Sequence, residues 1–236
     1  MKKFLILTMA FSLFGCAEMQ QVMNQFPQTD GTGLLNISGG LKEALNNGIS
    51  KQVTKLTATD GFYKNEAVKI LLPEELRKVD AGLRSIGLSS LADEGLRVLN
   101  RAAEEAVKEA TPIFVDAVTN MSFADARGIL MGNESAATSY LQNSTSTALY
   151  GKFNPVIKNS FTKVGADKVW TNIITKYNSI PLVNKVNPDL TDYVTNQALN
   201  GVFKMVAVEE KNIRTNLSSR TSVLLQRVFA LQDKKM

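Results

Sequence analysis

Apolar residues recur at intervals of three and four along most of the chain, which is the spacing of helices that bury one face. Leu41, Leu45, Val53 and Leu56 form the first such stripe. Strand signals are scarce, because the runs with a period of two are short and no Asn-Gly or Asp-Gly turn joins two of them. The pattern predicts an all-α protein, a single multi-helix domain of about eight helices.

Turn and capping residues divide the first half of this pattern. An Asp-Gly turn in ATDGFYKN ends the first helix, and the next helix begins at Pro73 and closes at Gly87. Between them, the stretch AVKILLP is predicted as a brief extended piece. The longest helical stretch runs over 89–121, and we expect a kink at Pro112, because proline lacks the N–H that a helix interior needs.

The second half is divided in the same way. Ser122 is expected to cap a short helix that ends at Gly132. Pro155 is expected to interrupt the helix that follows. The remaining helices are predicted over 166–178, over 189–214, and from Ser218 or Ser219 onward.

The first residues follow a different pattern. Two lysines, at positions 2 and 3, precede an apolar run over residues 4–14. This run is too short to span a membrane, since a spanning helix needs roughly 20 residues. Its length and flanks are those of a secretory signal. It ends on LFGC, residues 13–16, which resembles the lipobox of bacterial lipoproteins, although Phe14 departs from the usual small or β-branched residue.

Cys16 is the only cysteine of the chain. The lipobox resemblance implies that its thiol carries a diacylglyceryl group and that its amino group is acylated after cleavage. Two or more acyl chains give a stable anchor, since each buried CH₂ contributes about 0.8 kcal/mol. The alternatives are an ordinary secretory signal with a chance cysteine, or a buried free thiol. Ala17, where an Asp would retain the protein, points to the outer membrane under the sorting rule of enterobacterial lipoproteins.

These features predict three parts. They are a signal peptide over 1–15, the lipidated cysteine and a flexible tether over 16–38, and an all-helical domain over 39–236. The tether is rich in Gln, Asn, Thr and Gly and lacks a sustained period, as flexible spacers do. We therefore expect a lipid-anchored protein on the periplasmic side of the outer membrane.

Composition removes several function classes. The 236 residues include no histidine, which excludes Ser-His-Asp and Cys-His arrangements and histidine-containing metal sites. No P-loop and no EF-hand spacing is present, so no cofactor is expected. The formal charge of +5 falls to +3 without the two lysines of the signal. Because the basic residues are also spread among acids, no nucleic-acid partner is expected.

Acid–base pairs on the predicted helices are the main candidates for a polar site. The spacing allows Arg101 to pair with Glu105, and Glu210 with Arg214, since each pair is four residues apart. Such sets are interpreted first as ties between helix ends, and alternatively as the lining of a cleft for an anionic or carbohydrate group. The candidate cluster comprises Asn100, Arg101, Glu104, Asp125, Arg127, Glu210, Arg214 and Arg220.

Glu134 is the strongest candidate for a catalytic residue. With Ser135 it resembles the Glu-Ser pair of the lytic transglycosylases, in which a single glutamic acid acts as general acid. The Gly-Leu-Met-Gln-type motif that follows in those enzymes is missing. An acid at a helix start is also stabilised as an anion, which is the wrong form for a general acid. The preferred interpretation of Glu134 is therefore a helix-start residue.

Several stretches, taken in order, closely resemble the bacterial family called domain of unknown function 4197. The resemblance covers about residues 40–232. It implies an exported, often lipidated, helical protein of Gram-negative cells, and it carries no established activity or active site. The stretches are GLKEAL, LPEELRKV, NRAAEEAVKEATPIF, DARGIL, GNESAATSYL, GVFKMVAVEEKNIR and RTSVLLQRVF.

Three functions remain open. The first is a non-enzymatic envelope protein that binds another protein, for which an exposed apolar patch would be evidence. The second is a carrier of a lipid or other apolar ligand, which needs a closed apolar cavity of roughly 300 Å³ or more. The third is a peptidoglycan hydrolase that uses Glu134, which needs a half-buried glutamate in a cleft. We expect binding rather than catalysis, because no complete catalytic motif is present.

Replacing Cys16 with Ala tests the anchor. We expect the wild-type protein to carry the mass of its acyl chains and to fractionate with membranes, and the variant to lose both properties. Intact-mass spectrometry and membrane fractionation measure the two effects. A wild-type protein that runs unmodified in the soluble periplasm would contradict the lipoprotein assignment.

Overall fold

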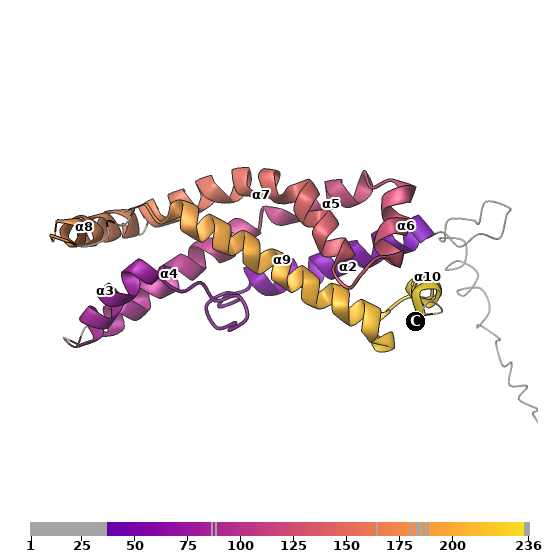
Figure 1. Ribbon diagram of the computed structural model, residues 1–236, viewed down its shortest axis with the longest axis horizontal. Coiled ribbons are helices and arrows are strands. Elements are labelled where there is room, and N and C mark those ends of the chain that lie inside the picture. The colour runs from indigo at the N-terminus through magenta and orange to yellow at the C-terminus, as the bar shows by residue number, and fades with distance from the viewer. Residues whose placement is uncertain are drawn as a thin grey trace, which may run out of the picture. The chain divides into compact units, whose positions relative to one another are not determined.

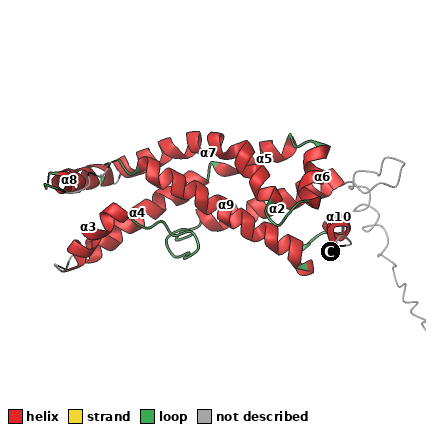
Figure 2. Cartoon of the chain, in the orientation of Figure 1, coloured by secondary structure: helices red, strands yellow, loops and turns green. Residues whose placement is uncertain are grey.

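The computed structural model describes residues 37–233, apart from positions 86, 88, 164, 180, 183, 184, 186 and 188. The predicted signal, Cys16 and nearly all of the predicted tether lie outside the described residues. Every regular element of the described part is a helix, and no strand occurs there (Figure 2). The all-α prediction is confirmed. In this part of the chain, no helix is long and apolar enough to cross a membrane.

The helices follow one another with short connections, and the longest connection joins the first two. The elements are α2 (Ile37–Thr57), α3 (Glu74–Ser85), α4 (Ser89–Val107), α5 (Ala110–Thr119), α6 (Phe123–Met131), α7 (Ala136–Lys163), α8 (Ala166–Asn178), α9 (Thr191–Thr215), a 3-10 turn (Leu217–Ser219) and α10 (Val223–Asp233).

The long helices α2, α4, α7 and α9 build the core. The most extensive packing joins α7 to α9 and α7 to α4, while α2 packs on α5, α6, α9 and α10 (Figure 1). Alanines at 102, 103 and 106 are buried on α4, and such small side chains allow a neighbouring helix to approach closely. Phe114 and Phe203 meet edge to face, with ring centroids 6.0 Å apart, which is a favoured geometry for aromatic pairs.

The stretch predicted as one kinked helix over 89–121 is two helices. The break falls after Val107, and Pro112 is the third residue of α5 rather than the site of a kink. The N–H groups of the first helical turn have no partner inside the helix, so a proline there costs no hydrogen bond. Pro112 therefore marks a helix start, and the prediction of a kink was wrong.

Pro155 does not interrupt the following helix, contrary to the prediction. It lies inside α7, which continues on both sides of it. Phe153 and Ile157 are buried on either side of this exposed proline, and their packing stabilises the helix across it. Tertiary packing thus outweighs the lost hydrogen bond.

Of three other predicted helix boundaries, the two of α6 are confirmed and the start of the last helix is not. Ser122 caps α6 through a capping box with Asp125, and α6 ends at Gly132, as expected. The last helix begins at Val223, because Ser222 accepts the Leu225 N–H at 3.1 Å, whereas Ser218 and Ser219 lie in the 3-10 turn. The segment AVKILLP forms turns and irregular backbone, not a strand.

Two glycines allow close contact between elements. A Cβ at Gly201 of α9 would lie 2.7 Å from Cε1 of Phe62, a fully buried ring of the α2–α3 connection. A Cβ at Gly95 of α4 would lie 2.9 Å from the ring of Trp170, which comes from α8. Both contacts need the space that a side chain would occupy.

Gly201→Ala is expected to destabilise the protein by about 1–3 kcal/mol, because the added methyl group overpacks the Phe62 ring. Urea denaturation followed by circular dichroism measures the change. Gly151→Ala is the matched control, since this glycine also lies inside a long helix but a Cβ there meets nothing within 4 Å. The control is expected to gain roughly 0.5–1 kcal/mol from helix propensity. Equal effects at the two sites would contradict the packing argument.

Candidate functional site

Asn100 of α4 holds the connection between α2 and α3 from inside the protein. Its amide group is fully buried and accepts the Ile70 N–H at 2.8 Å while donating to the Ile70 carbonyl at 2.9 Å. These are the two bonds that a neighbouring strand would make to the same residue. Asn100 therefore satisfies an irregular buried backbone that has no strand partner.

Glu104 and Arg101 fix the other end of the same connection. The buried Glu104 carboxylate accepts the Phe62 N–H at 3.0 Å and the Arg101 guanidinium at 2.6 Å. Arg101 also binds Asp60, whose φ of 66° is in the left-handed region. The expected pair of Arg101 with Glu105 does not form, because Arg101 takes Glu104 and Asp60 while Glu105 binds Lys108.

The charge of Asp60 is stabilised by its neighbours. A hydrogen bond from Lys64 at 2.8 Å is the main cause that holds the pKa of the Asp60 carboxyl below its ordinary value, and Arg101 acts in the same direction. Asp60 therefore stays an anion at neutral pH, and its pair with Arg101 is maintained.

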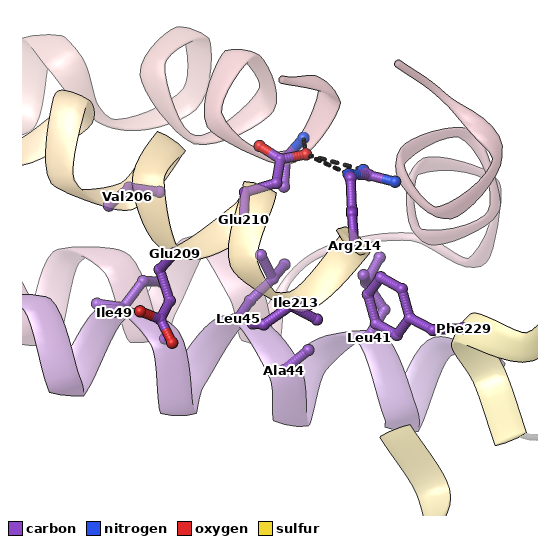
Figure 3. A pocket seen from close by; sticks show the side chains of 12 residues that line it. Leu41, Ala44, Leu45, Ile49, Val206, Glu209, Glu210, Ile213, Arg214 and Phe229 are labelled. Carbon is purple, nitrogen blue, oxygen red and sulfur yellow. Dashed lines mark hydrogen bonds and ion pairs between the residues drawn. The ribbon is translucent and has the colours of Figure 1, made fainter. Parts of the chain in front are cut away.

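Glu210 of α9 caps the N-terminus of α7. Its carboxylate accepts the N–H groups of Ala137 and Thr138 at 2.9 and 2.8 Å, and also the Thr138 hydroxyl at 2.8 Å. Arg214 donates to the same carboxylate at 2.8 and 3.0 Å (Figure 3). Both side chains of this pair are at most 5% exposed. An anion at a helix N-terminus is favoured by the helix dipole as well.

Arg214 and Arg220 bind backbone carbonyl groups at helix C-termini. Arg214 donates to the carbonyls of Ile129 and Leu130 in the last turn of α6, at 2.8 and 3.3 Å. Arg220 donates to the carbonyls of Ile213 and Arg214 near the end of α9, at 3.0 and 2.9 Å. Arg220 also binds Asp233, and this hydrogen bond holds the pKa of the Asp233 carboxyl below its ordinary value.

Glu209 forms a third buried contact, toward α2. It accepts hydrogen bonds from Lys51 and Gln52, each at 2.6 Å. Beside it lies a cavity of about 30 Å³ between α2, α7, α9 and α10, which Figure 3 shows lined by Leu45, Ile213 and their neighbours. This volume has room for about one water molecule. The buried glutamates 104, 209 and 210 thus all serve as acceptors in structural contacts.

The remaining candidates lie on the surface. Asp125 is engaged in the capping box with Ser122, and Arg127 is exposed on α6. Glu134 is exposed in the turn before α7, whose first N–H groups are bound by Glu210 instead. The predicted polar cluster is therefore not one site. It comprises a set on α4, a set around the end of α9, and two surface residues of α6.

An open cleft of about 760 Å³ lies along α4, between the ends of α2 and α7. One face of α4 and the residue after its end carry charges of both signs into it, at Glu94, Arg97, Arg101, Glu105 and Lys108. The ends of α2 and α7 add hydroxyl groups and a cation, at Thr57, Thr59, Ser160 and Lys163. Across the part of the chain that is described, no group of three or more acidic or thiol side chains is placed to hold a metal ion.

Of this lining, only Arg101 and Glu104 belong to the predicted polar cluster, and Glu105 was expected only as a partner of Arg101. Arg97 and Lys163 were missed. The spacing of charges by three and four along α4 was the available signal for Arg97. No signal of this kind marks Lys163, which reaches the cleft from another helix.

The helical fold and its internal polar clusters define an all-α domain. A family model described as "Protein of unknown function (DUF4197)" matches residues 33–230, and the chain belongs to this family. No curated protein and no solved structure matches the chain significantly.

Glu210→Gln is expected to destabilise the protein by about 3–5 kcal/mol, because it leaves the buried Arg214 without its counter-ion. The NH₂ group of the new glutamine is a hydrogen-bond donor. It would face the N–H donors of α7 or of Arg214, which need an acceptor. Glu105→Gln is the control, since its pair with Lys108 is half exposed, and we expect a loss of at most about 1 kcal/mol. Urea denaturation measures both. A small loss for Glu210→Gln would show that the α7 cap is dispensable.

Proposed function

We propose that this protein is a lipid-anchored cell-envelope protein that binds another molecule at the cleft along α4 and catalyses no reaction. The observation that carries the proposal is the cleft itself. Its volume of about 760 Å³ falls in the usual range of ligand sites, about 300–1,000 Å³. Its lining combines charged and hydroxyl side chains from three helices, which is a composition suited to a polar ligand.

The described interior gives little support to a lipid carrier. The apolar space between α2, α7, α9 and α10 is about 30 Å³, far below the roughly 300 Å³ that an apolar ligand needs. Apolar side chains fill the rest of this region, among them Leu41, Ile49 and Phe229. A polar ligand at an open cleft therefore fits the molecule better than an acyl chain in its core.

A glutamate-based hydrolase also has less support. The buried carboxylates of Glu104, Glu209 and Glu210 are engaged as acceptors of hydrogen bonds from backbone N–H groups or cationic side chains. Glu134 is exposed and borders neither the small cavity nor the cleft along α4. General-acid catalysis needs a carboxyl group beside the bound substrate, and Glu134 lies outside the cleft.

The location rests on the N-terminal sequence. The lipobox-like residues 13–16 support an envelope protein anchored through Cys16, with Ala17 favouring the outer membrane. The anchor would keep the cleft within reach of partners in the periplasm.

Site-specific photo-crosslinking in living cells tests the binding site. A photoreactive residue at position 57 or 105, both of which line the cleft, is expected to give a discrete adduct, because a bound partner would lie beside it. The same residue at position 204, an exposed lysine of α9 that does not line the cleft, is the control. Equal labelling at all three positions would contradict a site at the cleft. Release of muropeptides from peptidoglycan that disappears in Glu134→Gln would replace the binding function with a hydrolase.

A further inference from the structure

We infer that the cleft along α4 binds an oxyanion, a phosphate or carboxylate group of its ligand, through Arg97 and Lys163. This inference rests on the proposed function, because it names the chemical class recognised at the same cleft.

The cations that line the cleft outnumber the acids that compete for a ligand. Glu104 is buried and bound by Arg101, so its carboxylate does not compete with a ligand for the other cations of the cleft. Arg101 is also bound to Asp60, which leaves it committed to holding the α2–α3 connection. The charges that remain available are three cations and two acids, namely Arg97, Lys108, Lys163, Glu94 and Glu105.

Arg97 is the cation best suited to bind an oxyanion. Its one ion pair is with Glu94, three residues earlier on the same helix, and both side chains are about half exposed, at 51% and 49%. Exposed pairs of this kind contribute little to stability, so a ligand can replace the glutamate readily. A guanidinium also offers two parallel N–H groups that match the two oxygens of a carboxylate or phosphate.

Lys163 supplies the second charge from a different helix. It is the last residue of α7, it is exposed, and it makes no ion pair or side-chain hydrogen bond with the described residues. The end of a helix favours a lysine by itself. What points to a ligand is its place in a cleft of this size, together with the hydroxyl groups of Ser160 and Thr59 and with Arg97 on the neighbouring helix.

The size of the cleft shows that the oxyanion is one group of a larger ligand. A free phosphate or acetate ion fills a small part of about 760 Å³. The small anions are therefore probes of the Arg97 and Lys163 subsite, and they are expected to bind more weakly than a ligand that fills the cleft.

Isothermal titration calorimetry of the full chain, purified in a non-ionic detergent, tests the inference. The probes are inorganic phosphate, acetate, and dihexanoyl phosphatidylglycerol kept below its critical micelle concentration. We expect saturable binding of at least one probe, weakened about tenfold by Arg97→Gln and by Lys163→Gln, since each removes a charge-assisted contact. Glu94→Gln is expected to tighten binding, because it removes the competing acid, and Lys204→Gln is expected to leave it unchanged.

The outcomes distinguish the possible sources of the anion. They also distinguish a failure of this inference from a failure of the proposed binding site. Tightest binding of the phospholipid, of phosphate or of acetate identifies a lipid headgroup, a soluble phosphate or a carboxylate, and each supports the inference. Failure of all probes to bind, or binding that neither Arg97→Gln nor Glu94→Gln changes, overturns it. If positions 57 and 105 crosslink a partner in that case, the cleft remains a binding site for another class of ligand. If crosslinking fails as well, both proposals fall.

Discussion

Helix ends that lie inside the protein impose the main constraint on this fold, because their unpaired N–H and carbonyl groups must be satisfied there. Glu210 and Arg214 meet this need together, one at the start of α7 and the other at the end of α6. Their mutual ion pair neutralises the two buried charges. The packing of α6, α7 and α9 depends on this arrangement, since either residue alone would leave a buried charge.

The same constraint explains the wall of the cleft. The connection between α2 and α3 is irregular and partly buried, and it has no strand to bind its backbone. Asn100 and Glu104 bind that backbone from α4, and Arg101 joins Glu104 to Asp60. One face of α4 is thereby fixed in place, and its charged residues line the open cleft. Structural and candidate binding residues thus alternate along one helix.

Local signals predicted much of the fold but little of the site. Helical spacing and the Ser122 cap depend on residues a few positions apart, and both were correctly predicted. The path of α7 through Pro155 was not, because buried side chains on both sides of the proline decide it. Glu210 and Ala137 are 73 residues apart, so no local pattern could join them. The cleft was missed for the same reason, since Lys163 reaches it from another helix.

Trp170 has a practical consequence for following the motions of this protein. It is the only tryptophan of the chain, its ring is 7% exposed, and it rests against Gly95, between the cleft residues Glu94 and Arg97 along the sequence. Its emission spectrum is therefore an intrinsic optical probe of one contact, the seating of α8 on α4. A shift toward longer wavelengths, while the circular dichroism stays helical, would report that this contact opens before the rest of the molecule unfolds.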